Sequence, residues 1–171
     1  VYNALILTSG QNSPGINHAA ISEGNKIYGS RIGASSQLSS EVFFEQYLGN
    51  TFAGELALVS TSLDHKKVAF SPVSTALLSV HWYFNAFVKD QNGPLANARV
   101  EAYDKSNNLV FGISTDNEGK IPEQTLLSYT QNRSGSQLKY PYTIKIMKPG
   151  YRSQQKTTDL IGDVNLEFLL D

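Results

Sequence analysis

The chain has 171 residues, enough for one large or two small domains. Only 17% of them are charged and the net charge is −1, which excludes the basic field expected of a protein that binds nucleic acid or an anionic membrane. There is no cysteine, which excludes a disulfide scaffold, a thiolate metal site and a cysteine nucleophile.

Serine, asparagine, glutamine and threonine supply the polarity that charged residues usually supply, and this composition suits an extracellular protein with many β-turns. No apolar run approaches the ~20 residues of a membrane-spanning helix, so we predict no membrane insertion. The chain begins at Val1, which we interpret as either a processed mature N-terminus or the start of a fragment.

We predict two regions, residues 1–80 and residues 81–171. In the first, an Asn-x-apolar-x-Gly pattern begins at Asn25 and again at Asn50. This spacing suits the rungs of a parallel β-helix, which take roughly 20–30 residues each, and residues 65–70 would form a further, shorter rung. The alternative is an ordinary antiparallel sheet with Asn/Gly turns. Residues 41–48 fit either one or two helical turns or a strand.

The second region alternates apolar and polar residues between turn clusters, which is typical of antiparallel strands. We predict a long polar loop over residues 123–137, and a tight hairpin turn in which Asn107 and Asn108 both adopt positive φ. The fold class is therefore all-β, an antiparallel sandwich preceded by a β-rich segment. The strands are expected over residues 81–89, 98–103, 109–114, 140–147 and 163–170.

The turns of this region carry a recognisable set of residues, namely Asp90, Gly93, Pro94, Leu95, Ala98 and Val100, then Thr115, Asp116 and Gly119, and finally Gly150 and Tyr151. This order resembles the carboxypeptidase regulatory-like (transthyretin-like) β-sandwich, over about residues 82–171. The resemblance implies a transthyretin-like or Ig-like sandwich of the kind that usually serves as an accessory module.

A related sandwich, found in pilins and adhesins, carries an intramolecular Lys–Asn isopeptide bond. In that family the lysine lies two residues before the turn aspartate, where this chain has Val88. Lys89 is adjacent, but the two-residue period of a strand points it to the opposite face. We therefore predict that this crosslink does not form.

No motif for catalysis is present: the sequence has neither HExxH nor G-x-S-x-G, and we predict that the protein is not an enzyme and needs no cofactor. Two turn clusters resemble fragments of calcium loops. Their candidate calcium ligands are Asp90, Asn92, Asp116 and Glu118, although turn chemistry also explains these residues.

Two further residues are candidates for modification or binding. Asn132 begins an Asn-Arg-Ser sequon and is a candidate for glycosylation in a secreted chain. Tyr129, in the predicted polar loop, is the best candidate for stacking on a carbohydrate, whereas aromatic residues on strands more often belong to a core.

Both ends of the chain are strand-like and apolar, and they could pair with an open sheet edge of a neighbouring subunit or close their own sheet. The candidate assembly residues are Val1, Leu5, Leu7, Val164, Leu166, Phe168 and Leu170. The sequence thus predicts an extracellular or cell-surface structural module, such as a filament subunit, whose partners are copies of itself or neighbouring domains. The alternatives are the C-terminal accessory domain of a β-helical carbohydrate-active enzyme, and a carbohydrate-binding module.

Overall fold

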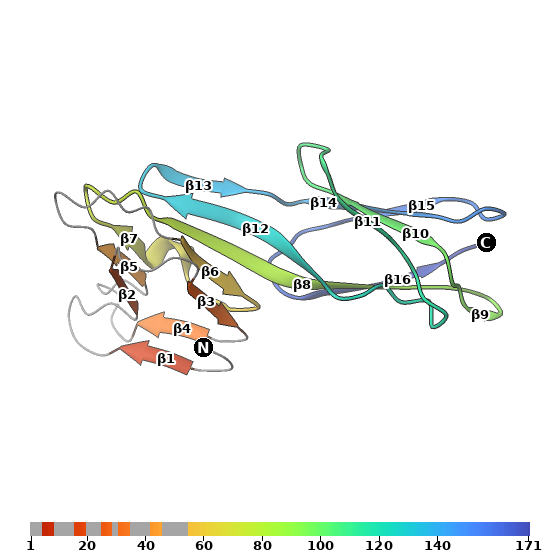
Figure 1. The fold of residues 1–171 in the computed structure, drawn as a ribbon, viewed down its shortest axis with the longest axis horizontal. Helices are drawn as coiled ribbons and strands as arrows, with labels where there is room; N and C mark the ends of the chain where they lie inside the picture. Colours follow the sequence, from red (N-terminus) through yellow and green to blue (C-terminus); the bar gives the residue numbers. More distant parts are fainter. Residues whose placement is uncertain (1–4, 9–15, 20–24, 29–30, 35–41, 46–54) are drawn as a thin grey trace. The chain divides into compact units, whose positions relative to one another are not determined.

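The computed structural model describes residues 5–8, 16–19, 25–28, 31–34, 42–45 and 55–171 (Figure 1). The chain divides into two compact units. Unit 1 comprises Val1–His81 and Tyr129–Leu138, and unit 2 comprises Trp82–Ser128 and Lys139–Asp171. The predicted all-β fold class is confirmed, with sheets that pack as a sandwich. None of the helices described is long and apolar enough to cross a membrane.

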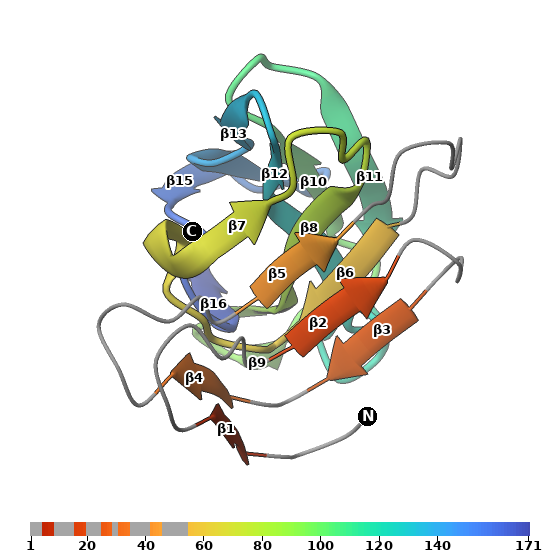
Figure 2. The same ribbon diagram turned by 90° about the vertical axis from the view of Figure 1, so that its left-hand side faces the viewer.

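Unit 1 is built from short strands that pair in parallel (Figure 2). Strand β1 pairs with β4, β2 pairs with β5 and β5 with β7, and β3 pairs with β6, which in turn pairs with the start of β8. These strands are β1 (Leu5–Thr8), β2 (Ile16–Ala19), β3 (Asn25–Tyr28), β4 (Arg31–Ala34), β5 (Val42–Glu45), β6 (Glu55–Val59), β7 (Val68–Phe70) and β8 (Leu77–Asp90).

The ladders set a different register from the one that the repeated asparagines suggested. Asn25 pairs with Leu56, whereas Asn50 lies outside the described residues. Of the two alternatives for residues 41–48, the strand is the one found, since β5 covers Val42–Glu45. The residues expected to form a short further rung comprise the 3-10 turn η1 (His65–Lys67) and strand β7, and β7 pairs with β5 in parallel.

Unit 2 contains a four-stranded sheet with the order β11-β10-β14-β15. All neighbours in this sheet are antiparallel. The facing sheet is organised around β8, which pairs with β12 and, in parallel, with β16. The remaining strands are β9 (Gly93–Pro94), β10 (Arg99–Tyr103), β11 (Leu109–Ser114), β12 (Gln124–Asn132), β13 (Gly135–Leu138), β14 (Tyr142–Met147), β15 (Gln154–Thr158) and β16 (Val164–Leu169).

The core of unit 2 follows the two-residue period of its strands, because alternate side chains point to the same face of a sheet. Val100 and Ala102 of β10 are fully buried, and so are Ile144 and Ile146 beside them on β14. The fully buried members from the facing sheet are Phe84 and Val88 of β8 and Phe168 of β16. The Tyr142 hydroxyl donates to the Leu127 carbonyl oxygen at 2.8 Å, and burial raises the pKa of Tyr142 to about 12.

The predicted polar loop over residues 123–137 is wrong, because this segment forms strands β12 and β13. Its polar residues alternate with buried ones, and Leu126 and Ser128 are almost fully buried. The Ser128 hydroxyl donates to the Leu160 carbonyl oxygen at 2.6 Å. This hydrogen bond allows the polar side chain of Ser128 to occupy an interior position. Strand β15, with the polar sequence QQKTT, was likewise not predicted.

The hairpin between β10 and β11 is wider than the tight turn predicted. Asn107 has positive φ as expected, at 62°, but Asn108 is not among the positive-φ residues. The Asp104 side chain instead organises the turn, since Oδ1 accepts hydrogen bonds from the amides of Ser106 and Asn108, both at 2.9 Å. The register shifts between Ala102 and Tyr103, as expected of a β-bulge.

Candidate functional site

Strand β16 holds three of the predicted assembly residues, and Leu170 follows it directly. The strand lies in the sheet of its own unit. It pairs in parallel with β8, with Phe168 opposite Val88. The side chains of Phe168 and Leu170 are buried in the core, while Val164 and Leu166 are partly buried against it. At the other end of the chain, Leu5 and Leu7 belong to β1, and Val1 lies outside the described residues.

The first calcium candidate, Asp90, is engaged in a turn. Its Oδ1 atom accepts hydrogen bonds from the amides of Asn92 at 2.7 Å and Gly93 at 3.1 Å, and its Oδ2 atom accepts one from the Tyr151 hydroxyl at 2.8 Å. Asp90, Asn92 and Tyr151 line a pocket of about 550 Å³ in unit 2, together with Leu169 and other neighbours. The Tyr151 hydrogen bond, followed by that of the Asn92 amide, lowers the pKa of Asp90 below its usual value of 3.8.

Replacing Tyr151 by phenylalanine is expected to raise the pKa of Asp90 towards 3.8, because the largest cause of the shift is removed. A carboxyl whose pKa is lowered on folding contributes stability above its unfolded pKa and loses it as pH falls through the folded pKa. The variant should therefore lose part of this contribution above about pH 4, and the difference should vanish once the pH falls below the lowered pKa of Asp90. An NMR titration of the Asp90 carboxyl carbon measures the shift, and Tyr103→Phe serves as the control. An unchanged Asp90 titration in Tyr151→Phe would contradict the assignment.

The second pair of calcium candidates lies in the turn after β11. Asp116 Oδ1 accepts hydrogen bonds from the amides of Glu118 and Lys120, both at 2.9 Å, and Glu118 forms an ion pair with Lys120 at 2.9 Å. Across the part of the chain that the structure describes, no group of three or more acidic or histidine side chains could hold a metal ion. Turn formation accounts for the amide hydrogen bonds of Asp90 and Asp116, and Asp90 also accepts one from the distant Tyr151. Calcium binding at these turns stays a prediction.

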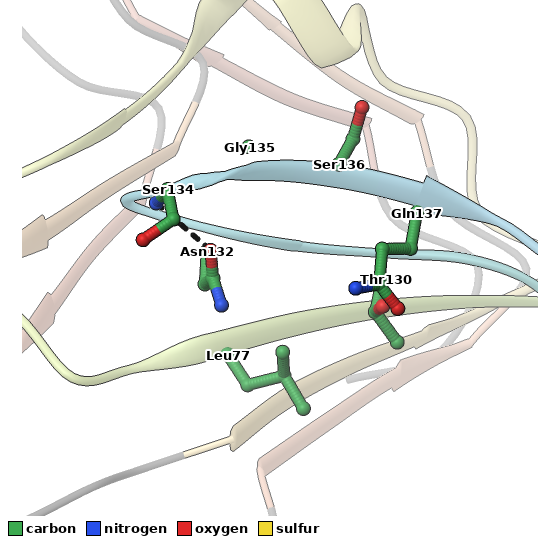
Figure 3. A pocket seen from close by; sticks show the side chains of 7 residues that line it. All are labelled: Leu77, Thr130, Asn132, Ser134, Gly135, Ser136 and Gln137. Atoms are coloured by element: carbon green, nitrogen blue, oxygen red, sulfur yellow. Dashed lines mark hydrogen bonds between the residues drawn. The ribbon is translucent and has the colours of Figure 1, made fainter.

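The glycosylation candidate Asn132 is exposed at the turn between β12 and β13. Its Oδ1 atom accepts a hydrogen bond from the Ser134 amide at 2.8 Å, as Figure 3 shows. The hairpin and Leu77 of β8 enclose a pocket of about 340 Å³ in unit 1. Gly135 has a φ of 137°, and apart from its own atoms and those of its two chain neighbours no atom of the described residues lies within 4 Å of the position that a Cβ atom would take there. Modification of Asn132 stays a prediction.

Tyr129 does not lie in an exposed loop, contrary to the sequence interpretation. It belongs to β12, is partly buried, and its ring contacts that of His65 edge-on with 6.3 Å between the centroids. The hydroxyl oxygen is also buried. A side chain held in this way does not present its ring face as a platform, so the proposed carbohydrate stacking at Tyr129 has no support in the fold.

Two residues of β8 bear on the isopeptide argument. Val88, which stands where the related sandwiches have their lysine, is fully buried in the core. Lys89 forms an ion pair with Glu167 of β16 instead, on the partly exposed side of the strand.

The most informative feature for function is how the sheets of unit 2 end, because an unpaired strand edge can pair with another chain. Two edges carry devices that hinder such pairing. Strand β15 is polar and has Lys156 at its centre. The carbonyl oxygens of Glu167 and Leu169, on β16, accept hydrogen bonds from the side chains of Lys156 and Gln154, respectively. Lys156 Nζ also lies 4.7 Å from the ring centroid of Phe168.

The edge formed by β11 lacks such protection. Strand β11 occupies the end of the four-stranded sheet and pairs only with β10 among the described strands. Its sequence, LVFGIS, contains no charged residue and no proline, and two of its apolar side chains, Leu109 and Val110, are 53% and 45% exposed. The alternation of residues 109–114 predicts a strand here but does not identify it as a sheet edge. Its lack of charge was the only available signal.

No family model matches the chain, and no curated protein matches it. Among solved structures, it is similar to a mutant of the shaft pilin SpaA from Lactobacillus rhamnosus GG, with 15% identity, a TM-score of 0.40, and coverage of 52% of this chain and 46% of that one. It is also similar to the Bacillus anthracis TIE protein, with 16% identity, a TM-score of 0.41, and coverage of 59% and 19%.

A third similar structure is 3-chlorocatechol 1,2-dioxygenase from Rhodococcus opacus 1CP, with 13% identity, a TM-score of 0.36, and coverage of 53% and 59%. The match spans less than two thirds of each of these three proteins. A structural protein and an enzyme are found at comparable similarity, and these values carry no argument about function. Membership of the carboxypeptidase regulatory-like family stays a prediction.

Proposed function

We propose that this protein is a non-catalytic structural module of the cell surface that associates with copies of itself or with neighbouring domains of a surface protein. The observation that carries the proposal is the uncharged apolar edge of β11. Soluble proteins generally protect their sheet edges, and β15 and β16 follow this rule through Lys156 and Gln154. An edge left open in the same unit therefore favours an interaction role.

The surface location is supported by the composition, which is low in charge and rich in uncharged polar residues. Exchange of the terminal strands is a less favourable form of assembly for this fold, because it removes buried side chains from a core. Donation of β16 to a neighbour would remove Phe168 and Leu170 from the core of their own unit. Pairing at an edge requires no such rearrangement, so the proposal places association at an edge.

A second candidate rests on the parallel ladders of unit 1. Strands β1, β2 and β3 each pair with one neighbour within the described residues, so a stack of parallel coils could continue beyond them. The chain would then be the end of a longer β-helical protein, as proposed above for a carbohydrate-active enzyme. The carbohydrate chemistry itself has no support in the described residues.

The test is the mass and assembly state of the native protein, measured by sedimentation equilibrium, electron microscopy and intact mass spectrometry. We expect concentration-dependent association, visible as a rising weight-average mass or as regular polymers. A strictly monomeric species up to millimolar concentration would overturn association between copies of the chain and leave only association with neighbouring domains. A native chain extended by further coils would favour the second candidate.

A further inference from the structure

We infer that β11 pairs with β11 of a second copy of this chain, antiparallel and around a two-fold axis at Gly112. The inference rests on the proposed function and names the partner and register of the association. Pairing of the two β11 strands joins two four-stranded sheets into one continuous sheet, since each β11 is the end strand of its own sheet.

The hydrogen-bond pattern of β11 determines which residues are available for pairing. The Thr115 amide donates to the Ala98 carbonyl oxygen at 2.9 Å, so Thr115 directs its backbone groups towards β10. Backbone groups alternate between the two sides of an antiparallel strand. Gly112 and Ser114, at odd spacing from Thr115, therefore direct theirs away from β10. In a new antiparallel ladder, residues whose backbone groups point away from β10 must lie opposite each other. A two-fold axis at Gly112 meets this requirement, because it places Gly112 opposite the partner's Gly112.

This register also brings compatible side chains together. Phe111 lies opposite the partner's Ile113, and symmetry repeats that pair on the other side of the axis. Phe111 and Ile113 already pack against the core of their own unit, on one face of the sheet. Because the residues at these positions direct their backbone groups to β10, the new pairs are of the closely spaced kind. Aromatic and β-branched residues opposite each other stabilise such pairs by about 0.2–1 kcal/mol each.

Charge favours a second copy at this edge and opposes it at the β15 edge. The six residues of β11 are uncharged, so self-pairing brings no like charges together within the strand. Antiparallel self-pairing of β15 around its centre would place Lys156 opposite the partner's Lys156.

One charged residue lies near the axis, namely Arg99, whose guanidinium lies over Gly112. Arg99 Nε lies 3.3 Å from Glu101 Oε1, so it carries its own counter-charge. A hydrogen bond from the Tyr103 hydroxyl lowers the pKa of Glu101 below its ordinary value of 4.5.

The two-fold geometry predicts a dimer rather than a polymer from this contact alone, because an isologous interface is closed. The paired strand is short and the contact small, so we expect a dissociation constant in the range of roughly 10 μM to 1 mM. A longer assembly would require a second, different contact on each dimer.

The first experiment compares two lysine substitutions by sedimentation equilibrium on the full chain. Val110→Lys adds a charge to an exposed position of β11, opposite the partner's Ser114, and should weaken dimerisation at least about tenfold. Thr157→Lys adds the same charge to an exposed position of β15 and should leave dimerisation unchanged. Both positions are exposed, so far-UV circular dichroism should report the same fold for both. The inference would be overturned if the two substitutions weakened dimerisation equally, or if Val110→Lys left dimerisation unchanged.

The second experiment tests the register and uses the absence of native cysteine. A mixture of Phe111→Cys and Ile113→Cys chains should give a disulfide-linked heterodimer under mild oxidation, in excess of either homodimer. Crosslinking of Phe111→Cys with itself would instead place the axis at residue 111 and overturn the proposed register. Association without any β11 crosslink would overturn the inference and leave the proposed function standing. A strictly monomeric wild type would overturn the inference and the self-association in the proposed function, and would leave association with neighbouring domains as its remaining form.

Discussion

Replacing Phe168 by alanine should lower the free energy of unfolding of unit 2 by about 3–5 kcal/mol, the usual range for removing a fully buried phenylalanine. Phe168 has no exposed surface and belongs to the core that Phe84 and Val88 also form. Urea denaturation followed by tryptophan fluorescence measures the change, since Trp82 packs against this core.

Leu169→Ala provides the matched control, because the neighbouring side chain on the same strand is 55% exposed. Its effect should lie within about 0.5 kcal/mol of zero. The comparison also bears on the assembly candidates at the C-terminus. If Phe168→Ala were as mild as the control, β16 would not close the sheet of its own unit, and its exchange with a neighbouring subunit would become the better explanation of assembly.

Replacing Thr115 by valine should cost about 2–4 kcal/mol, although the two side chains have nearly the same shape. The Thr115 hydroxyl donates to the Leu95 carbonyl oxygen at 2.6 Å and accepts from the Ala98 amide at 2.9 Å. Thr115 is 3% exposed and Ala98 is fully buried, so solvent cannot replace either hydrogen bond. Valine leaves two buried backbone groups without this partner.

The control is Thr157→Val on strand β15, where the side chain is exposed and valine suits a strand. Chemical denaturation of both variants gives the comparison, and we expect little or no loss for Thr157→Val. Equal stability of Thr115→Val and the wild type would show that the hydroxyl does not hold the segment from Leu95 to Ala98 against the end of β11.

The turn residues of unit 2 were predictable because their roles are local. Gly119 adopts a φ of 73°, and a Cβ atom there would lie 2.3 Å from the Val88 carbonyl oxygen. Asp90, Asp104 and Asp116 each accept hydrogen bonds from amides within four residues. Interactions of this range depend on a few neighbouring residues, so the sequence pattern indicates them directly.

The strands β12 and β15 were not predicted because their burial depends on distant parts of the chain. Ser128 occupies an interior position only because the Leu160 carbonyl oxygen, 32 residues away, accepts its hydrogen bond. Lys156 and Gln154 are polar by sequence, yet they act by covering the backbone of β16. Polar composition predicted a loop over residues 123–137 and gave no strand over residues 154–158, and tertiary contacts made both segments strands.

The sequence by itself determined that the chain is all-β, where most strands of unit 2 run, and which residues make its turns, because alternation and turn chemistry are properties of neighbouring residues. Only the tertiary structure decided which strands are edges. An edge is defined by the absence of a neighbour in the sheet, and sheet order follows from pairing between residues far apart in the chain. Strand β11 thus differs from β10 in its place in the sheet, and that place makes it the candidate contact with a second copy.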